Sequence, residues 1–293
     1  MTALNPLQHA ARGSLLATRL ADLATDALVD EAMLTPKPGL VDMRGNGAHD
    51  DLSWLLMCRS ACALRPAFLR MAEAGAAIQD PALLRRRIGA IGRDAEAAMM
   101  AATGGINTHR GAIWALGLLV TAAARGSQPD AAAIAHDAGL LACIDDPGAP
   151  ASTGNKGELA CRTHGVSGAR GQARAGFPAV LHAALPMLRL SRARGDGEPQ
   201  ARVNALLAVM ATLDDTCLLA RGGRRALQAT QAGARRVLGL QGIATPHGRA
   251  ALRALETRMR RLHVSPGGAA DLLAAALLLD AIERQHARTR ATN

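Results

Sequence analysis

The stretch Thr35–Asp51 reads TPKPGLVDMRGNGAHDD and separates two segments with helical spacing. Pro36 and Pro38 flank Lys37, so no helix can run through this stretch. Its three glycines allow turns that other residues resist. A long, restrained loop that carries both charge signs between apolar helices is a typical place for a functional site. A solvated connector is the alternative, but it would need neither a lysine between prolines nor adjacent aspartates.

The spacing of apolar residues predicts an all-α fold, a single multi-helix domain over residues 1–293 with long loops rich in glycine and proline. Before the loop, Ser14–Leu34 has helical spacing, with Ser14 as the expected cap. After it, a helix is expected over Asp50–Ala76, interrupted near Pro66. We find no strand-like alternation and no internal repeat.

The rest of the chain divides at glycine and proline breaks. Helices are expected over Asp80–Ala102, with Asp80 as the cap, over Pro129–Cys143 and Arg202–Ala220, after Pro178 to about Arg194, and from about Arg224 and Pro246 onward. The segment Ile144–Arg170 reads as long and irregular, and Ser265 is expected to cap the last helix.

Composition limits the classes of function. Hydrophobic residues make up 49% of the chain and aromatic residues 1%, with no Tyr, so the core must be aliphatic. The net charge of +10 attracts anions, and nucleic acid must be considered. The aromatic platforms that stack single-stranded bases are missing, so polyphosphates or nucleotides explain the charge equally well. A genome rich in Arg codons is a further explanation of the positive charge.

The five cysteines are scattered and form no C-x-x-C pair, which indicates reduced thiols in a cytoplasmic protein. No secretory signal is expected at the start of the chain. The most apolar run, Ala269–Ala281, contains two aspartates and is too short to cross a bilayer. We therefore expect no membrane association.

A second candidate site lies in Thr103–Leu119, TGGINTHRGAIWALGLL. Two glycines open a turn, and Asn107 or Thr108 is expected to cap the apolar helix that follows. His109 and Arg110 fall in the first turn of this helix. Amide donors at that helix end favour a phosphate or ribose. The spacing is not that of a P-loop. A lone histidine is also commonly a satisfied or solvated residue.

Carboxylates and lysines complete the candidates. Asp214 and Asp215 precede a Gly-Gly break, and adjacent carboxylates there suit Mg²⁺, although Asp214 could simply face solvent. Glu31 is poorly placed against the helix dipole, which favours a functional role over a solvated one. Lys37 and Lys156 are the only lysines. The first looks selected as a compact ammonium, whereas Lys156 falls in the irregular segment and is not expected to act.

Several blocks together carry a resemblance. EAMLTPKPGLVD, NGAHDD, TGGINTHRGAIWALGLL, SGARGQARAGFP, DDT followed by ARGG, and SPGGAADLL occur in this order between Glu31 and Leu273. This series resembles the triphosphoribosyl-dephospho-CoA synthase family, which serves malonate decarboxylase and citrate lyase. The resemblance implies an all-α enzyme that joins the triphosphoribosyl group of ATP to the 2′-hydroxyl of 3′-dephospho-CoA and releases adenine. It also implies that a nucleotidyltransferase passes the product to an acyl carrier subunit.

The resemblance also implies the site residues. The expected catalytic residues are Glu31, Glu96, His49 and His109; the expected substrate-binding residues are Lys37, Asp42, Asn107, Thr108, Arg110, Arg170, Thr216, Arg221, Ser265 and Asp271; Asp51 and Asp215 are expected to hold Mg²⁺. Three positions depart from the family pattern. Arg110 stands where Lys is common, Gln172 where Glu is usual, and Cys217 where Asn is frequent.

The chemistry leaves several assignments open. Carboxylates would stabilise an oxocarbenium-like transition state. Glu31 or Glu96 would act as base, and His49 or His109 as acid or ribose contact. Lys37 would bind the triphosphate, or would only shape the loop through an ion pair with Asp42.

The rival classes are a different Mg²⁺-dependent helical nucleotide hydrolase and a non-catalytic nucleic-acid binder, of which we expect neither. The short variable segment before Ser167 favours malonate decarboxylase over citrate lyase. The sequence does not decide whether the chain forms a homo-oligomer.

Overall fold

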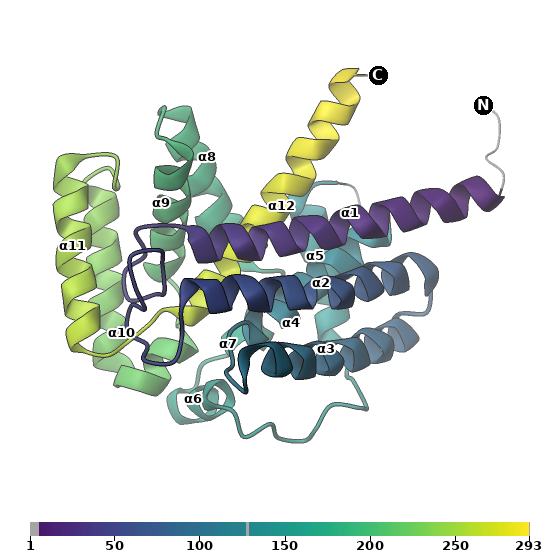
Figure 1. Ribbon diagram of the computed structural model, residues 1–293, viewed down its shortest axis with the longest axis horizontal. Helices are drawn as coiled ribbons and strands as arrows, with labels where there is room; N and C mark the ends of the chain where they lie inside the picture. Colours follow the sequence, from purple (N-terminus) through teal and green to yellow (C-terminus); the bar gives the residue numbers. More distant parts are fainter. Residues whose placement is uncertain (1–5, 127–128, 293) are drawn as a thin grey trace.

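The computed structural model describes residues 6–126 and 129–292, which form helices and loops without a strand (Figure 1). The elements are α1 (Pro6–Met33), α2 (Trp54–Ala77), α3 (Pro81–Thr103), α4 (Arg110–Ala124), α5 (Ala131–Cys143), α6 (Lys156–His164), α7 (Gly168–Arg174), the π-helix η1 (Val180–Ala184), α8 (Leu185–Ala193), α9 (Glu198–Met210), α10 (Thr216–Gly239), α11 (Pro246–Arg261) and α12 (Gly267–Thr292). The all-α prediction is confirmed.

Two central helices carry the core. In α4, 11 of 15 residues are buried, and in α12 the run from Ala269 to Leu279 is buried throughout apart from Asp271. A helix that is apolar on every side must be surrounded by others. The long helices α1, α2 and α3 lie side by side in front of α4, and α10 and α11 form a helical hairpin at the end of the molecule opposite the start of α1 (Figure 1).

The start of α2 differs from the sequence prediction. The helix begins at Trp54, and its cap is Ser53, whose Oγ accepts from the Leu56 amide at 3.3 Å. Asp50 therefore lies in the loop and does not cap the helix. Pro66 lies inside a continuous helix, because packing against α1, α3 and α4 compensates for the hydrogen bond that the proline cannot make.

Of three predicted helix caps, one is confirmed and two are wrong. Asp80 caps α3 as expected, with Oδ1 accepting from the Leu83 amide at 2.7 Å. Ser14 lies within α1, because the helix already begins at Pro6. Ser265 does not cap α12, since its buried hydroxyl has no hydrogen-bond partner among the described residues.

Two predicted boundaries in the second half are wrong. The segment Ile144–Arg170 is not irregular throughout, since α6 occupies nine of its residues and α7 begins at Gly168. The predicted helix Arg202–Ala220 is interrupted, because α9 ends at Met210 and α10 begins at Thr216. The aspartate at the break is Asp215. An aspartate is more favourable as the N-cap of α10 than in the middle of a helix.

None of the described helices combines the length and the apolar character that crossing a membrane requires.

The close approach of α2 and α4 generates a stability prediction. A Cβ on Gly75 would collide with the Thr121 carbonyl oxygen, whereas a Cβ on Gly92 of α3 would meet only the Met71 Cε at 3.7 Å. Gly75→Ala should therefore lower the free energy of unfolding by about 1–3 kcal/mol despite the higher helix propensity of alanine. The matched change Gly92→Ala should raise it by about 0.5–1 kcal/mol. Urea unfolding of both variants measures this, and equal effects would show that α2 and α4 are not in close contact.

Candidate active site

One cavity of about 1320 Å³ collects nearly all of the predicted site residues. It lies where the loop of residues 34–53, the first turns of α4, α10 and α12, and the helices α6 and α7 meet. Fifteen of the sixteen predicted residues line it: Glu31, Lys37, His49, Asp51, Glu96, Asn107, Thr108, His109, Arg110, Arg170, Asp215, Thr216, Arg221, Ser265 and Asp271. Residues from distant parts of the chain therefore share one space.

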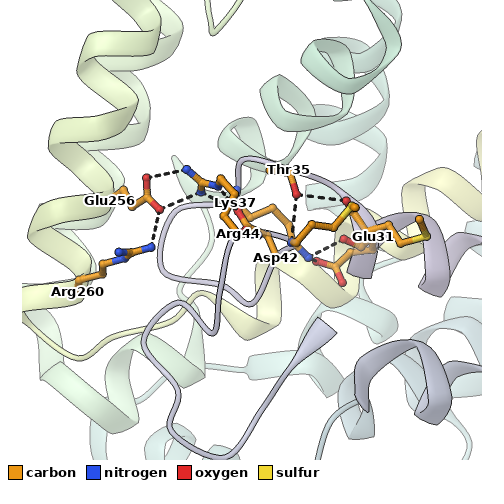
Figure 2. A network of polar contacts seen from close by, with 9 residues as sticks. Glu31, Thr35, Lys37, Asp42, Arg44, Glu256 and Arg260 are labelled. Atoms are coloured by element: carbon orange, nitrogen blue, oxygen red, sulfur yellow. Dashed lines mark hydrogen bonds and ion pairs between the residues drawn. The ribbon is translucent and has the colours of Figure 1, made fainter. Parts of the chain in front are cut away.

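Two residues that line this cavity form a buried ion pair, whose contacts Figure 2 shows. Lys37 Nζ donates to Glu31 Oε1 at 2.7 Å and to the Glu31 carbonyl oxygen at 2.5 Å. Both residues are at most 3% exposed. Two buried opposite charges stabilise each other, and removal of either leaves the other without compensation. The pair fixes the loop onto the last turn of α1 and leaves one ammonium proton for another acceptor.

Asp42 does not line the cavity. Its Oδ2 accepts from the Lys37 backbone amide at 2.9 Å, and its Oδ1 accepts from the Arg44 amide at 2.8 Å. The Arg44 guanidinium bridges Asp42 Oδ2 at 2.7 Å and Glu256 Oε1 of α11 at 2.9 Å (Figure 2). Asp42 therefore shapes the loop from behind. The alternative of a Lys37–Asp42 ion pair is wrong, because the ammonium contacts Glu31 and only the backbone contacts Asp42.

His49 and Asp51 lie at the outer part of the cavity. His49 Nδ1 is 3.2 Å from Arg221 Nη2 and 3.7 Å from Asp51 Oδ1. Burial and the charge of Arg221 lower the pKa of His49. Arg221 also donates to the Ala48 carbonyl at 3.2 Å, which ties the loop to α10. The Asp51 side chain is 63% exposed and so is open to a ligand or solvent.

His109 is the N-cap residue of α4 and is 2% exposed. Its Nδ1 lies 2.9 Å from the hydroxyl of Ser60 on α2, which lies 2.6 Å from Thr108 Oγ1. Its Nε2 has no hydrogen-bond partner among the described residues. Burial, with the charge of Lys37, lowers the pKa of His109 to about 3, so the imidazole is neutral at neutral pH.

The turn before α4 holds the remaining predicted residues of this block. Asn107 Oδ1 accepts from the Arg110 amide at 3.2 Å, but the N-cap residue is His109, so the prediction that Asn107 or Thr108 caps α4 is wrong. The Arg110 guanidinium donates to Glu96 Oε2 of α3 at 2.9 Å. Glu96 is 39% exposed on its side chain, so this pair lies nearer to solvent than the Lys37–Glu31 pair.

Asp215 joins two helix starts. Its Oδ1 accepts from the Cys217 amide at 2.8 Å, and its Oδ2 accepts from the Ala269 amide of α12 at 2.9 Å. Burial raises the pKa of Asp215, and these hydrogen bonds oppose the rise. A Cβ on Gly268 would lie 3.1 Å from Asp215 Oδ2. The carboxylate thus links α10 to α12 at the cavity wall.

Asp271 lies one turn further along α12, against the first turn of α4. A Cβ on Gly111 would collide with its Oδ2, which explains a glycine there. The Ala112 amide donates to its carboxylate. Burial, then the charges of Glu31 and Asp215, hold the pKa of Asp271 well above its usual range. The surroundings of Asp271 therefore disfavour its charged form.

Three cavity residues were missed by the sequence analysis. Lys156 lines the cavity as the first residue of α6, although it was assigned to an irregular segment. Trp114 and Phe177 also line it, and they are two of only four aromatic residues in the chain. The scarcity of aromatic residues was a signal that could have singled them out.

Comparison with known proteins gives a consistent picture. A family model described as ATP:dephospho-CoA triphosphoribosyl transferase matches residues 17–290. The chain is 55% identical over 280 residues to a Pseudomonas fluorescens protein named probable 2-(5″-triphosphoribosyl)-3′-dephosphocoenzyme-A synthase, covering 95% of this chain and 96% of that protein. It is 52% identical over 283 residues to the Klebsiella pneumoniae 2-(5″-triphosphoribosyl)-3′-dephosphocoenzyme-A synthase, covering 96% and 99%. No solved structure matches the chain.

The neutral state of His109 generates a prediction on pH. Its pKa is about 3 in the folded chain and about 6.5 when unfolded, so its contribution to stability is present above pH 6.5 and is lost as the pH falls toward 3. Unfolding between pH 6 and 4 should therefore take up about one proton more in the wild type than in His109→Gln. Urea unfolding at a series of pH values measures the slope. Equal slopes would mean that His109 is already protonated in the folded chain.

Proposed function

Because the chain belongs to the ATP:dephospho-CoA triphosphoribosyl transferase family, we propose that its cavity joins the triphosphoribosyl group of ATP to the 2′-hydroxyl of 3′-dephospho-CoA with release of adenine. The observation that carries this proposal is the gathering of buried carboxylates, cations and a neutral histidine around one space. The chain is a transferase that acts on ATP and dephospho-CoA.

The size and lining of the cavity support two substrates. About 1320 Å³ exceeds the roughly 300–1,000 Å³ of a pocket for one drug-sized ligand. Both substrates carry an adenine, and the partly exposed Trp114 offers aromatic surface in a chain that has little. Lys156 and Arg170 line the same space and suit phosphate oxygens.

Glu31 is the better placed of the two candidate bases. Its carboxylate lies buried beside the Lys37 ammonium in the cavity wall, where it can accept the proton of the attacking hydroxyl. The same negative charge would stabilise a developing oxocarbenium ion. Glu96 is half-exposed and paired with Arg110 nearer to solvent, so its position suits orienting a group better than taking a proton inside the cavity.

The two histidines separate into different roles. Neutral His109 fits a hydrogen bond to a ribose hydroxyl better than it fits an acid, because its imidazolium form is absent at neutral pH. Its orphaned Nε2 is a buried polar atom for which a substrate would supply the partner. Burial and Arg221 also lower the pKa of His49, but the Asp51 carboxylate favours its protonated form, so His49 is the better candidate acid of the two.

We propose that Mg²⁺ binds together with ATP, where it would neutralise the charge of the phosphates. Asp51, Asp215 and Asp271 line the cavity and offer the oxygen donors that Mg²⁺ prefers. Among the described residues no group of three His, Cys, Asp or Glu could hold a metal by itself, so phosphates would have to supply further ligands. Asp215 already accepts backbone amides, so of the two predicted ligands Asp51 fits better.

The destination of the product is a finer proposal. We favour the prosthetic-group precursor of malonate decarboxylase, transferred by a nucleotidyltransferase to an acyl carrier subunit, over the same role for citrate lyase. The support is the short variable segment before Ser167. Modification of one carrier subunit but not the other by the product would decide between them.

The proposed reaction predicts that adenine appears only when ATP and dephospho-CoA are both present. Glu31→Gln should lower kcat by about 10²–10⁴-fold, because the variant cannot accept the proton. Glu73→Gln, an exposed position on α2, serves as the matched control and should keep wild-type activity. Chromatography of adenine measures both. Adenine released from ATP alone at the same rate would instead indicate a nucleotide hydrolase.

A further inference from the structure

The positive charge of the chain is concentrated in one element pair. Residues 216–263, which we call the α10–α11 hairpin, contain ten arginines and one glutamate. The other residues contain 24 basic and 23 acidic side chains out of totals of 34 and 24, so they are almost neutral. A preference for Arg codons cannot explain this, because it would not remove acidic residues from one segment only.

All ten arginines of the hairpin are exposed. Among the described residues, the guanidinium groups of five of them make no hydrogen bond or ion pair: Arg225, Arg236, Arg253, Arg258 and Arg261. The single acidic residue, Glu256, pairs with Arg44 of the loop and with Arg260 (Figure 2). The hairpin therefore presents uncompensated positive charge to solvent.

One end of the hairpin borders the cavity. Arg221 in the first turns of α10 lines it, and so does Ser265, which follows the end of α11 by four residues. A Cβ on Gly222 would meet Val264 Cγ1 at 2.8 Å, so the start of α10 and the chain after α11 are in contact. Arg225, Arg258 and Arg261 lie near this end, whereas α11 itself contributes no residue to the cavity lining.

We propose that the α10–α11 hairpin is an electrostatic capture surface for the polyphosphate groups of the substrates. This inference rests on the proposed function, since ATP carries three phosphates and dephospho-CoA carries a pyrophosphate. Charges of one sign beside a cleft raise the local concentration of a polyanion and its rate of entry. At physiological ionic strength the field extends about 8 Å, so only the end near the cavity acts fully.

Small polyanions fit this surface better than nucleic acid does. Residues 216–263 contain no aromatic side chain on which a base could stack. The cavity that the hairpin borders is where phosphate groups must arrive. The test below includes a result that would indicate nucleic-acid binding instead.

The test compares two triple variants that remove the same charge. The first is Arg225→Gln with Arg258→Gln and Arg261→Gln, at exposed positions near the cavity. The control is Arg19→Gln with Arg86→Gln and Arg87→Gln, at exposed positions on α1 and α3, neither of which belongs to the hairpin. Calorimetry gives the Kd of ATP and of uncharged adenosine at 20 mM and 300 mM NaCl.

The hairpin variant should bind ATP about tenfold more weakly at 20 mM salt and close to normally at 300 mM, because salt screens the lost attraction. Adenosine binding should not change, and the control should match the wild type. An equal loss in both variants, or no loss in the hairpin variant, would overturn the proposal. The proposal would also be overturned if a DNA duplex bound only the hairpin variant more weakly, while ATP bound all three proteins equally. These Kd values are read without turnover, so the proposed reaction stands or falls separately on adenine release by the wild type.

Discussion

The buried ion pair between Lys37 and Glu31 is the constraint on which the site depends. It joins the last turn of α1 to a loop that has no helix of its own. Because neither charge reaches bulk solvent, the loop cannot move away without exposing an uncompensated charge to an apolar wall. Asp42 adds to this by holding the Lys37 amide, and the Arg44–Glu256 contact fastens the same loop to α11 (Figure 2).

Around that pair, three helices begin at the same cavity. The starts of α4, α10 and α12 bring to one place amides that have no partner within their own helix, which favours anionic groups. Asp215 satisfies amides of α10 and α12, and Asp271 satisfies an amide of α4. Close approach of these carboxylates requires glycine at 111 and 268. An all-helical chain can thus build a polar site by directing helix ends, rather than helix faces, at the substrate.

Much of this was predictable because helical periodicity and glycine–proline breaks are local signals. The loop 35–51, the cap at Asp80 and the glycine turn before His109 followed from residue chemistry alone. The predictions that failed depended on more than the local sequence pattern. Asp215 looked like a mid-helix residue because its second partner, the Ala269 amide, is 54 positions away. Lys156 was set aside because a nine-residue helix gives too short a periodic pattern to recognise.

The pairing of Lys37 with Glu31 was hidden for a different reason. Six positions separate them across a helix end and one proline, so no helical or strand rule brings them together. Sequence reasoning preferred a triphosphate contact for Lys37 and considered only Asp42 as a partner within the chain. The structure shows that the buried carboxylate at the helix end takes the ammonium and that Asp42 takes the backbone.

The measurement that tests this account most directly is a double-mutant cycle on the pair, read by urea unfolding at pH 7. Lys37→Met and Glu31→Gln should each lower the free energy of unfolding by about 3–5 kcal/mol, because each leaves a buried charge unpaired. The double variant should lose much less than the sum, with a coupling of about 2 kcal/mol or more. Additive losses, or single variants as stable as the wild type, would contradict the claim that this pair holds the loop and the site in place.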